Sequence, residues 1–171
     1  TPRFLAFMPF IFQWEGGYDN DPDDPGGETK YGIDKRSHPK ENIKALTKQR
    51  AQEIYFEEYW QKARCEDLPP GVGEVVMNIA VNCGHARAGK WLQLAAGMSK
   101  ESADGVIGPK TLQATKERHQ ETDKFYLTKA LIDRTELHYR GIARGSLAKF
   151  LRGWLNRNKA LASWVYILLS R

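Results

Sequence analysis

Residues 3–33 read RFLAFMPFIFQWEGGYDNDPDDPGGETKYGI, an apolar helical run that stops at a glutamate and continues as a glycine- and aspartate-rich loop. Glu15 stands at the expected end of the helix, where unpaired carbonyls make an acidic side chain about 0.3–1 kcal/mol less favourable than a basic one. Gly16 can close the helix in the left-handed conformation, but it does nothing for the charge. Glu15 therefore breaks a local rule, which indicates a role other than helix stability.

The surroundings of Glu15 favour a protonated carboxyl, because both the helix end and the aromatic neighbours disfavour the anion. The loop that follows supplies candidate ionised partners in a more solvated setting: Asp21, Asp23 and Asp24. A neutral acid near a charged carboxylate is the pair that glycosidic cleavage uses. The alternative is that Glu15 is a solvated helix-end residue and the loop is ordinary turn chemistry.

The composition is that of a folded domain with a basic surface. The 171 residues are 41% hydrophobic and 11% aromatic, enough for a core in one domain. The net charge of +5 favours a polyanionic partner, but the basic residues form no block, which argues against nucleic acid. Cys65 and Cys83 match no zinc or CxxC spacing, and the four histidines form no HExxH pair. We expect two reduced thiols, no metal and no cofactor.

Helical periodicity dominates the chain and predicts a mainly α fold with at most a small β-hairpin near residues 26–34. We expect helices over about 1–15 with a bend at Pro9, over 47–63, over 71–83 closed by Gly84, and in a segment that ends at Gly97. Further helices are expected from Pro109, over about 122–142, and from Leu147 onward.

Several motifs in order along the chain resemble glycoside hydrolase family 108, the N-acetylmuramidases found as phage endolysins and related bacterial lysozymes. Besides EGGYDNDPDDPGGETKYGI, these are EIYFEEYW, DLPPGV, AVNCG, KWLQ, ADGVIGPKTL and FLRGWLNR. The resemblance covers roughly residues 4–158 and implies a lysozyme-like helical fold. It implies one compact muramidase domain over 1–171, with a catalytic half (1–84), a peptidoglycan-binding-like half (85–158) and an apolar tail (159–171).

The resemblance implies that Glu15 is the proton donor. Phage-type lysozymes of another family space their catalytic residues as Glu, eight residues, Asp, five residues, Thr. Here Glu15 is followed after eight residues by Asp24, and Asp24 after four by Thr29. The first spacing supports Asp24, and the shorter second spacing leaves the identity of the second catalytic group open.

Five further residues are candidates for sugar binding. Tyr18, Tyr31 and Trp60 carry rings on which a sugar face can stack, with a core role as the alternative. Asn82 lies in an apolar helix and either caps that helix near Gly84 or faces the substrate cleft. For Gln93, too, the alternatives are a structural hydrogen bond and a contact with the substrate.

The sequence thus predicts a lysozyme that hydrolyses the β-1,4 bond between N-acetylmuramic acid and N-acetylglucosamine in peptidoglycan. The alternative is a non-catalytic peptidoglycan-binding or secretion-associated protein of the same fold, and an amidase is disfavoured by the absence of metal-ligand or Cys–His spacing. The basic surface and the apolar tail make an anionic outer membrane or lipid a further candidate partner. We expect a monomer, made in the host cytoplasm without a signal peptide and acting on the wall after release.

Overall fold

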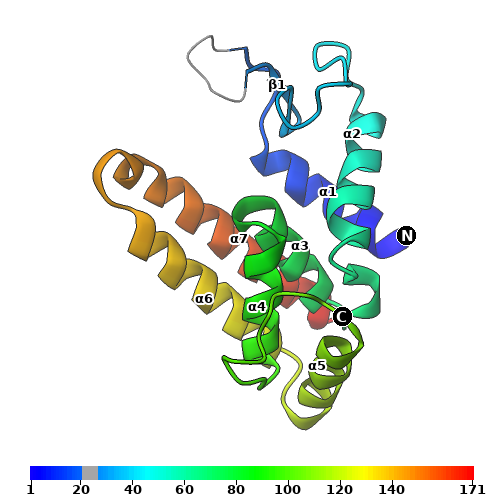
Figure 1. Ribbon diagram of the computed structural model, residues 1–171, viewed down its shortest axis with the longest axis vertical. Helices are drawn as coiled ribbons and strands as arrows, with labels where there is room; N and C mark the ends of the chain where they lie inside the picture. The colour runs from blue at the N-terminus through cyan, green and yellow to red at the C-terminus, as the bar shows by residue number, and fades with distance from the viewer. Residues whose placement is uncertain (21–26) are drawn as a thin grey trace. The chain divides into compact units, whose positions relative to one another are not determined.

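The computed structural model describes residues 1–20 and 27–171, so the three candidate aspartates of the loop, Asp24 among them, lie outside the described residues (Figure 1). The chain divides into two compact units, Thr1–Glu58 and Tyr59–Arg171. Within the described residues, helices dominate and the β-structure amounts to one two-stranded antiparallel hairpin with an adjoining bridge. The prediction of a mainly α fold with a small hairpin is confirmed.

Helix α1 (Pro2–Trp14) begins and ends as its sequence predicts. The Thr1 hydroxyl accepts a hydrogen bond from the Phe4 N–H, and Pro2 occupies the first turn, where its missing N–H costs nothing. The helix continues through Pro9, and Glu15 is its last cap residue. Gly16 then takes a φ of 70°, the left-handed conformation expected of it.

Helix α2 (Lys48–Tyr55) lies beside α1 and joins it through aromatic contacts (Figure 1). Thr47 caps it by accepting the Arg50 N–H at 3.1 Å. The ring of Phe4 meets that of Phe56 edge-on at 5.1 Å. After Tyr55 the helix continues as a π-helical turn, η1 (Phe56–Gln61), a change of winding that hydrophobic periodicity does not reveal.

The hairpin consists of β1 (Thr29–Lys30) and β2 (Ile33–Asp34), with Thr29 opposite Asp34. Its two-residue turn is Tyr31 and Gly32, with φ values of 53° and 78°. Positive φ at both positions is the turn geometry that matches the twist of paired strands. Asp19 adds an isolated bridge to Thr29, because each residue donates its N–H to the other's carbonyl at 2.8 Å.

The second unit is a helical assembly built around α3 (Val72–Cys83), which packs against α4 (His85–Ala95) and α6 (Tyr126–Ile142). Its other elements are η2 (Cys65–Asp67), α5 (Pro109–Glu121), η3 (Gly145–Phe150) and α7 (Leu151–Leu169). Helices α6 and α7 run alongside each other in Figure 1. Arg157 donates to the Asn78 side chain at 2.9 Å in the buried interior, which ties α7 to α3.

The apolar tail is the last part of α7 and not a separate segment. Leu161 and Val165 are buried, whereas Tyr166 and Ile167 are exposed. One face of the tail therefore belongs to the core, as a packing helix requires. Among the residues described, none of the helices combines the length and the hydropathy needed to span a bilayer.

Candidate active site

Glu15 lies against the glycine of the hairpin turn. A Cβ added to Gly32 would stand 2.8 Å from Glu15 Oε2 and 2.9 Å from Glu15 Cβ, and closer still to the Tyr55 hydroxyl. Glu15, Gly32 and Tyr55 therefore meet at one point, although they come from α1, the hairpin and α2. Only a residue without a side chain fits at this turn beside the carboxyl group.

Aromatic rings surround this point and hold the turn. Phe12 packs edge-on against Tyr31 at 5.6 Å and against Tyr55 at 6.0 Å. The Tyr55 hydroxyl donates to the Tyr31 carbonyl at 3.0 Å. Trp14, next to Glu15 in sequence, buries its indole N–H with no hydrogen-bond partner among the described residues. The half-buried Glu15 thus has the aromatic setting that its sequence neighbourhood predicts.

Thr29 and Tyr18 occupy the same unit as Glu15. Thr29 is half-buried in β1, and its hydroxyl donates to the Gly27 carbonyl at 3.2 Å. Tyr18 is exposed and donates its hydroxyl to Glu28 Oε1 at 2.7 Å. This hydrogen bond to Glu28 is the main reason that the pKa of Tyr18 is raised.

Glu28 is a residue that the sequence analysis did not single out. It precedes Thr29, binds the Tyr18 hydroxyl, and accepts the Lys35 N–H through its backbone carbonyl at 2.9 Å. It is a carboxylate within the described part of the loop that leads into the hairpin, so it joins Asp24 as a candidate second group. Its position directly before the motif threonine was the available signal.

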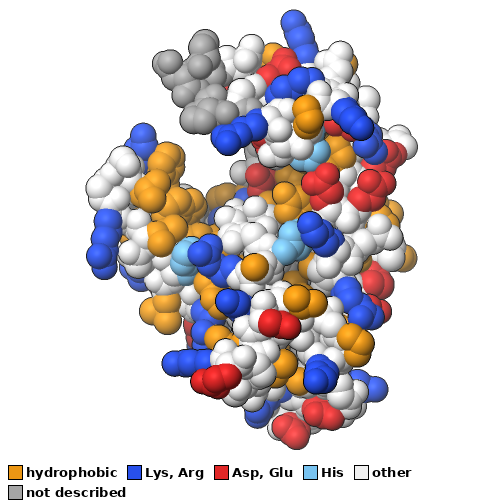
Figure 2. Space-filling model, viewed as in Figure 1, with side chains coloured by type: hydrophobic (Ala, Val, Ile, Leu, Met, Phe, Trp, Pro, Cys, Tyr) orange, Lys and Arg blue, Asp and Glu red, His pale blue; other side chains and the backbone are white. Residues whose placement is uncertain are grey.

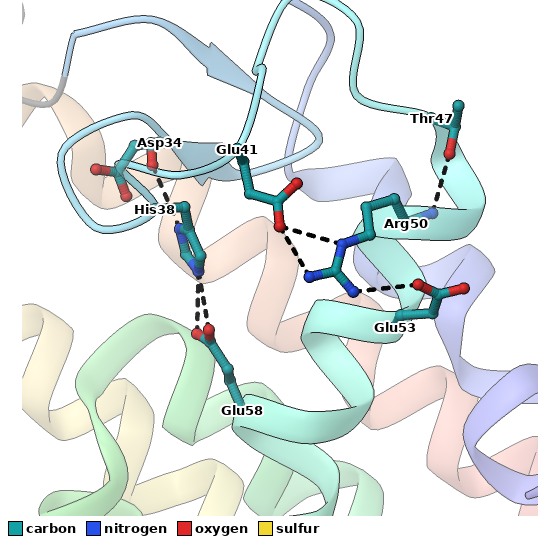
Figure 3. Close-up of polar contacts among 7 residues, drawn as sticks. All are labelled: Asp34, His38, Glu41, Thr47, Arg50, Glu53 and Glu58. Atoms are coloured by element: carbon teal, nitrogen blue, oxygen red, sulfur yellow. Dashed lines mark hydrogen bonds and ion pairs between the residues drawn. The ribbon is translucent and has the colours of Figure 1, made fainter.

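A histidine connects β2 to the π-helical turn (Figure 3). His38 Nδ1 lies 3.3 Å from the Asp34 carbonyl, and Nε2 lies 3.1 Å from both Glu58 carboxylate oxygens. Burial alone would raise the pKa of Asp34, but hydrogen bonds from Ser37 and the nearby His38 outweigh it, so this pKa lies below its ordinary value. The contacts anchor the end of the hairpin, and hence its turn, to helix η1.

A second ion-pair cluster in Figure 3 fixes the segment between the hairpin and α2. Arg50 binds Glu41 Oε1 through Nε at 3.1 Å and Nη2 at 2.8 Å, and it binds Glu53 through Nη1 at 3.1 Å. The hydrogen bond from Arg50 lowers the pKa of Glu41. The cluster therefore ties the segment that follows the hairpin to helix α2.

Trp60 and Asn82, predicted to bind sugar, belong to the second unit. Trp60 is 1% exposed and donates its indole N–H to Glu66 at 2.9 Å, so it is placed as a core residue. Asn82 is exposed and donates to the Asn78 carbonyl one turn earlier, at 2.7 Å. Sugar contacts by these residues stay predictions, and the burial of Trp60 favours its core alternative.

Gln93 organises the ADGVIGPKT loop from inside the protein. It is 1% exposed; its Nε2 lies within 2.7–3.1 Å of Asp104 Oδ1, the Val106 carbonyl and Thr111 Oγ1, and its Oε1 accepts the Gly105 N–H at 2.8 Å. The hydrogen bond from Gln93 is the main reason that the pKa of Asp104 is lowered. This placement favours the structural alternative for Gln93, and its role in substrate binding remains a prediction.

No group of three or more His, Cys, Asp or Glu side chains in the described ranges could hold a metal ion. Cys65 is buried and Cys83 is half-buried, and the two do not form a disulfide with each other. Burial raises the pKa of the Cys83 thiol, so at neutral pH the protonated form is favoured. Cys83 therefore lacks the lowered pKa of a catalytic thiol nucleophile.

Comparisons with known proteins agree with this arrangement. Residues 8–84 match the family model described as glycosyl hydrolase 108, and residues 87–159 match a predicted peptidoglycan domain. The solved structure titled "Structure of Brucella abortus SagA" is 35% identical, with a TM-score of 0.80 over 98% of this chain and 95% of that chain. A search of curated proteins gave no match.

The chain therefore belongs to the glycosyl hydrolase 108 family, as its motifs predicted. It is a lysozyme-like protein that acts on peptidoglycan. The two family models meet between residues 84 and 87, whereas the compact units meet between Glu58 and Tyr59, so the first model extends through α3. The predicted division at residue 84 into a catalytic and a binding half stays a prediction.

Proposed function

We propose that this protein is an N-acetylmuramidase that hydrolyses the β-1,4 bond between N-acetylmuramic acid and N-acetylglucosamine, with Glu15 as the general acid. The observation that carries the proposal is the position of Glu15 at the end of α1, half-buried against the hairpin turn in a glycosyl hydrolase family member. On the other side of the acid, Gly16 and Gly17 have no described atom within 4 Å of an added Cβ, so a bulky glycan has room to approach the carboxyl group there.

In this mechanism the Glu15 carboxyl gives its proton to the glycosidic oxygen as the bond to the anomeric carbon breaks. A water molecule supplies the hydroxyl group at the anomeric carbon, and its remaining proton passes to a carboxylate. Asp24, with Thr29, is the proposed second group that stabilises the oxocarbenium-like transition state or orients the water. The stereochemical outcome follows from the carboxyl separation, about 5 Å for retention and about 6.5–9.5 Å for inversion.

Product analysis tests the proposal. Purified peptidoglycan is incubated with the protein, and the soluble fragments are analysed for new reducing sugar ends and new free amines. A muramidase releases N-acetylmuramic acid reducing ends without new amines. An amidase or peptidase gives the reverse, and a non-catalytic binding protein gives neither product.

Glu15→Gln is the decisive variant, because the amide cannot donate the proton. Activity should fall by about 10²- to 10⁴-fold, the usual contribution of a general acid, while folding and wall binding are retained. Glu57→Gln is the matched control, since it makes the same change at an exposed glutamate of the same unit. A Glu15→Gln protein with near-wild-type turnover would refute the assignment.

A further inference from the structure

Trp91 lies between two open hollows on the second unit. One hollow, of about 550 Å³, is lined by Trp91 with residues of α6, namely Ala130, Asp133, Arg134, Leu137 and His138. The other, of about 450 Å³, is lined by Trp91 with Lys90 and residues 83–87. We use the name Trp91 surface for Arg87, Lys90, Trp91, Arg134, Leu137 and His138.

The motif KWLQ explains why a tryptophan is held at this surface. Residues two apart on a helix point to nearly opposite sides, so the burial of Gln93 at 1% exposure leaves Trp91, which is half-buried, on the outer side of α4. Helix α4 packs closely on the loop around Gly105, because a Cβ added to Gly89 would overlap the Gly105 carbonyl. Trp91 therefore projects from a helix that is closely packed on the rest of the unit, which suits a preformed binding site.

His138 supports the tryptophan from α6. The two rings meet edge-on with centroids 5.4 Å apart and an interplanar angle of 65°. Burial, and then the charge of Arg87, lowers the pKa of His138, so near neutral pH the imidazole packs as an uncharged ring. Leu137 beside it is 71% exposed, which adds an apolar side chain to the same hollow.

The charges around Trp91 are mostly positive, although Arg87 also donates to the Cys83 carbonyl at 3.1 Å, and the hydrogen bond from Gln93, assisted by Lys90, lowers the pKa of Asp104. Arg87, Lys90 and Arg134 line the two hollows, and none of them forms an ion pair with a carboxylate among the described residues. Asp133, the acidic residue of the first hollow, is paired with Lys129. Figure 2 shows Lys and Arg side chains among hydrophobic and histidine side chains over α4 and α6.

An aromatic face bordered by unpaired cations fits a ligand that combines apolar sugar faces with carboxylates. We propose that the Trp91 surface binds a peptidoglycan strand, with an amino-sugar ring on Trp91 and carboxylates of the peptide stems on Arg87, Lys90 and Arg134. The inference rests on the proposed function, in which peptidoglycan is the substrate, and it assigns a separate contact for holding the strand.

The test measures binding of the protein to purified peptidoglycan sacculi by co-sedimentation. All variants carry Glu15→Gln, so that the sacculi are not digested during the measurement. Trp91→Ala should weaken binding about tenfold or more, because loss of a central aromatic anchor has effects of this size. Trp91→Phe should recover part of the affinity. Tyr126→Ala, at an exposed aromatic of α6 outside the hollows, should leave it unchanged.

A double substitution of two arginines tests the role of the cations without disturbing the core. Arg87→Gln with Arg134→Gln should weaken binding and reduce its salt dependence, since fewer carboxylate contacts remain to be screened. Arg152→Gln with Lys159→Gln, exposed on α7, makes the same change in net charge and should have little effect. Uncharged N-acetylglucosamine oligomers should bind more weakly than stem-bearing fragments, and should depend on Trp91 alone.

The outcomes separate this inference from the proposed function. Unchanged sacculus binding by folded Trp91→Ala and Arg87→Gln/Arg134→Gln proteins overturns the inference, even if the parent protein releases reducing ends. An equal loss of binding in the two double variants, Arg87→Gln/Arg134→Gln and Arg152→Gln/Lys159→Gln, overturns it too, because net charge alone would then explain binding. If the Trp91→Ala and Arg87→Gln/Arg134→Gln proteins lost binding to phosphatidylglycerol vesicles and kept their binding to sacculi, the Trp91 surface would be assigned to lipid. If the parent protein failed to release reducing ends but its binding to sacculi still depended on Trp91, the proposed muramidase activity would be refuted and the inference about the Trp91 surface would stand.

Discussion

A methyl group on Gly32 would stand 2.8 Å from Glu15 Oε2. The acid at the end of α1 can therefore hold its position only while the hairpin turn has a glycine at position 32. The two residues are far enough apart in sequence that neither helix nor turn rules connect them. The hairpin register and the Tyr55 hydroxyl bring them into contact. The position of the proposed catalytic acid therefore depends on the turn.

Gly32→Ala should consequently reduce activity by more than the strain of an alanine at positive φ can explain. The new Cβ forces Glu15 and Tyr55 to move, and alanine at positive φ adds about 1–2 kcal/mol of strain. Gly27→Ala is the matched control, because its φ of 70° imposes similar strain while no described residue lies within 4 Å of the added Cβ. Release of reducing ends, normalised to folded protein, should fall for the first variant and persist for the second. Equal activity of the two would contradict the dependence.

Gln93→Ala should destabilise the second unit without a specific loss of catalysis. The substitution leaves the partly buried Gly105 N–H without its acceptor, at a cost of about 1–3 kcal/mol, and removes the contacts of the Gln93 amide with the Val106 carbonyl and the Thr111 hydroxyl. Gln113→Ala, at an exposed glutamine, should change the free energy of unfolding little. Denaturant unfolding measures both variants. A stable Gln93→Ala protein with weakened wall binding would instead support the predicted sugar contact.

His138 should make the protein less stable in mild acid. Its pKa in the folded protein is lowered by burial and by Arg87, so the unfolded chain takes up the proton more readily. The contribution of the neutral ring is present above the ordinary histidine pKa, about 6.5, and is lost as pH falls through the lower folded value. Melting temperatures across this range should decline less for His138→Phe than for the parent, and parallel curves would contradict this expectation.

Ile167→Ser separates the two roles considered for the tail. Ile167 is 56% exposed, so the change should leave stability nearly unaltered, unlike deletion of residues 160–171, which removes the buried Leu161 and Val165. If the tail disturbs membranes, the variant should retain hydrolysis of purified wall and lose leakage from anionic vesicles. Retention of both activities would leave packing as the function of the tail.

Local chemistry made several elements predictable from sequence. They are the Thr1 cap, the glycine that closes α1, the small hairpin near residues 26–34, Gly84 between α3 and α4, and Pro109 at the start of α5. Each depends mainly on residues that are close together along the chain. The π-helical turn was not predicted, because its hydrogen bonds shift by one residue inside an otherwise ordinary amphipathic pattern.

The sequence by itself determined the family, the helical class and the identity of Glu15 as an acid out of place at a helix end. Only the tertiary structure decided that Gly32 and Tyr55 meet that acid, that Trp60 and Gln93 are buried, and that Trp91 is bordered by unpaired cations. The reason is that caps and turns are set by neighbours along the chain, whereas burial and charge pairing are set by residues that folding brings together from distant positions.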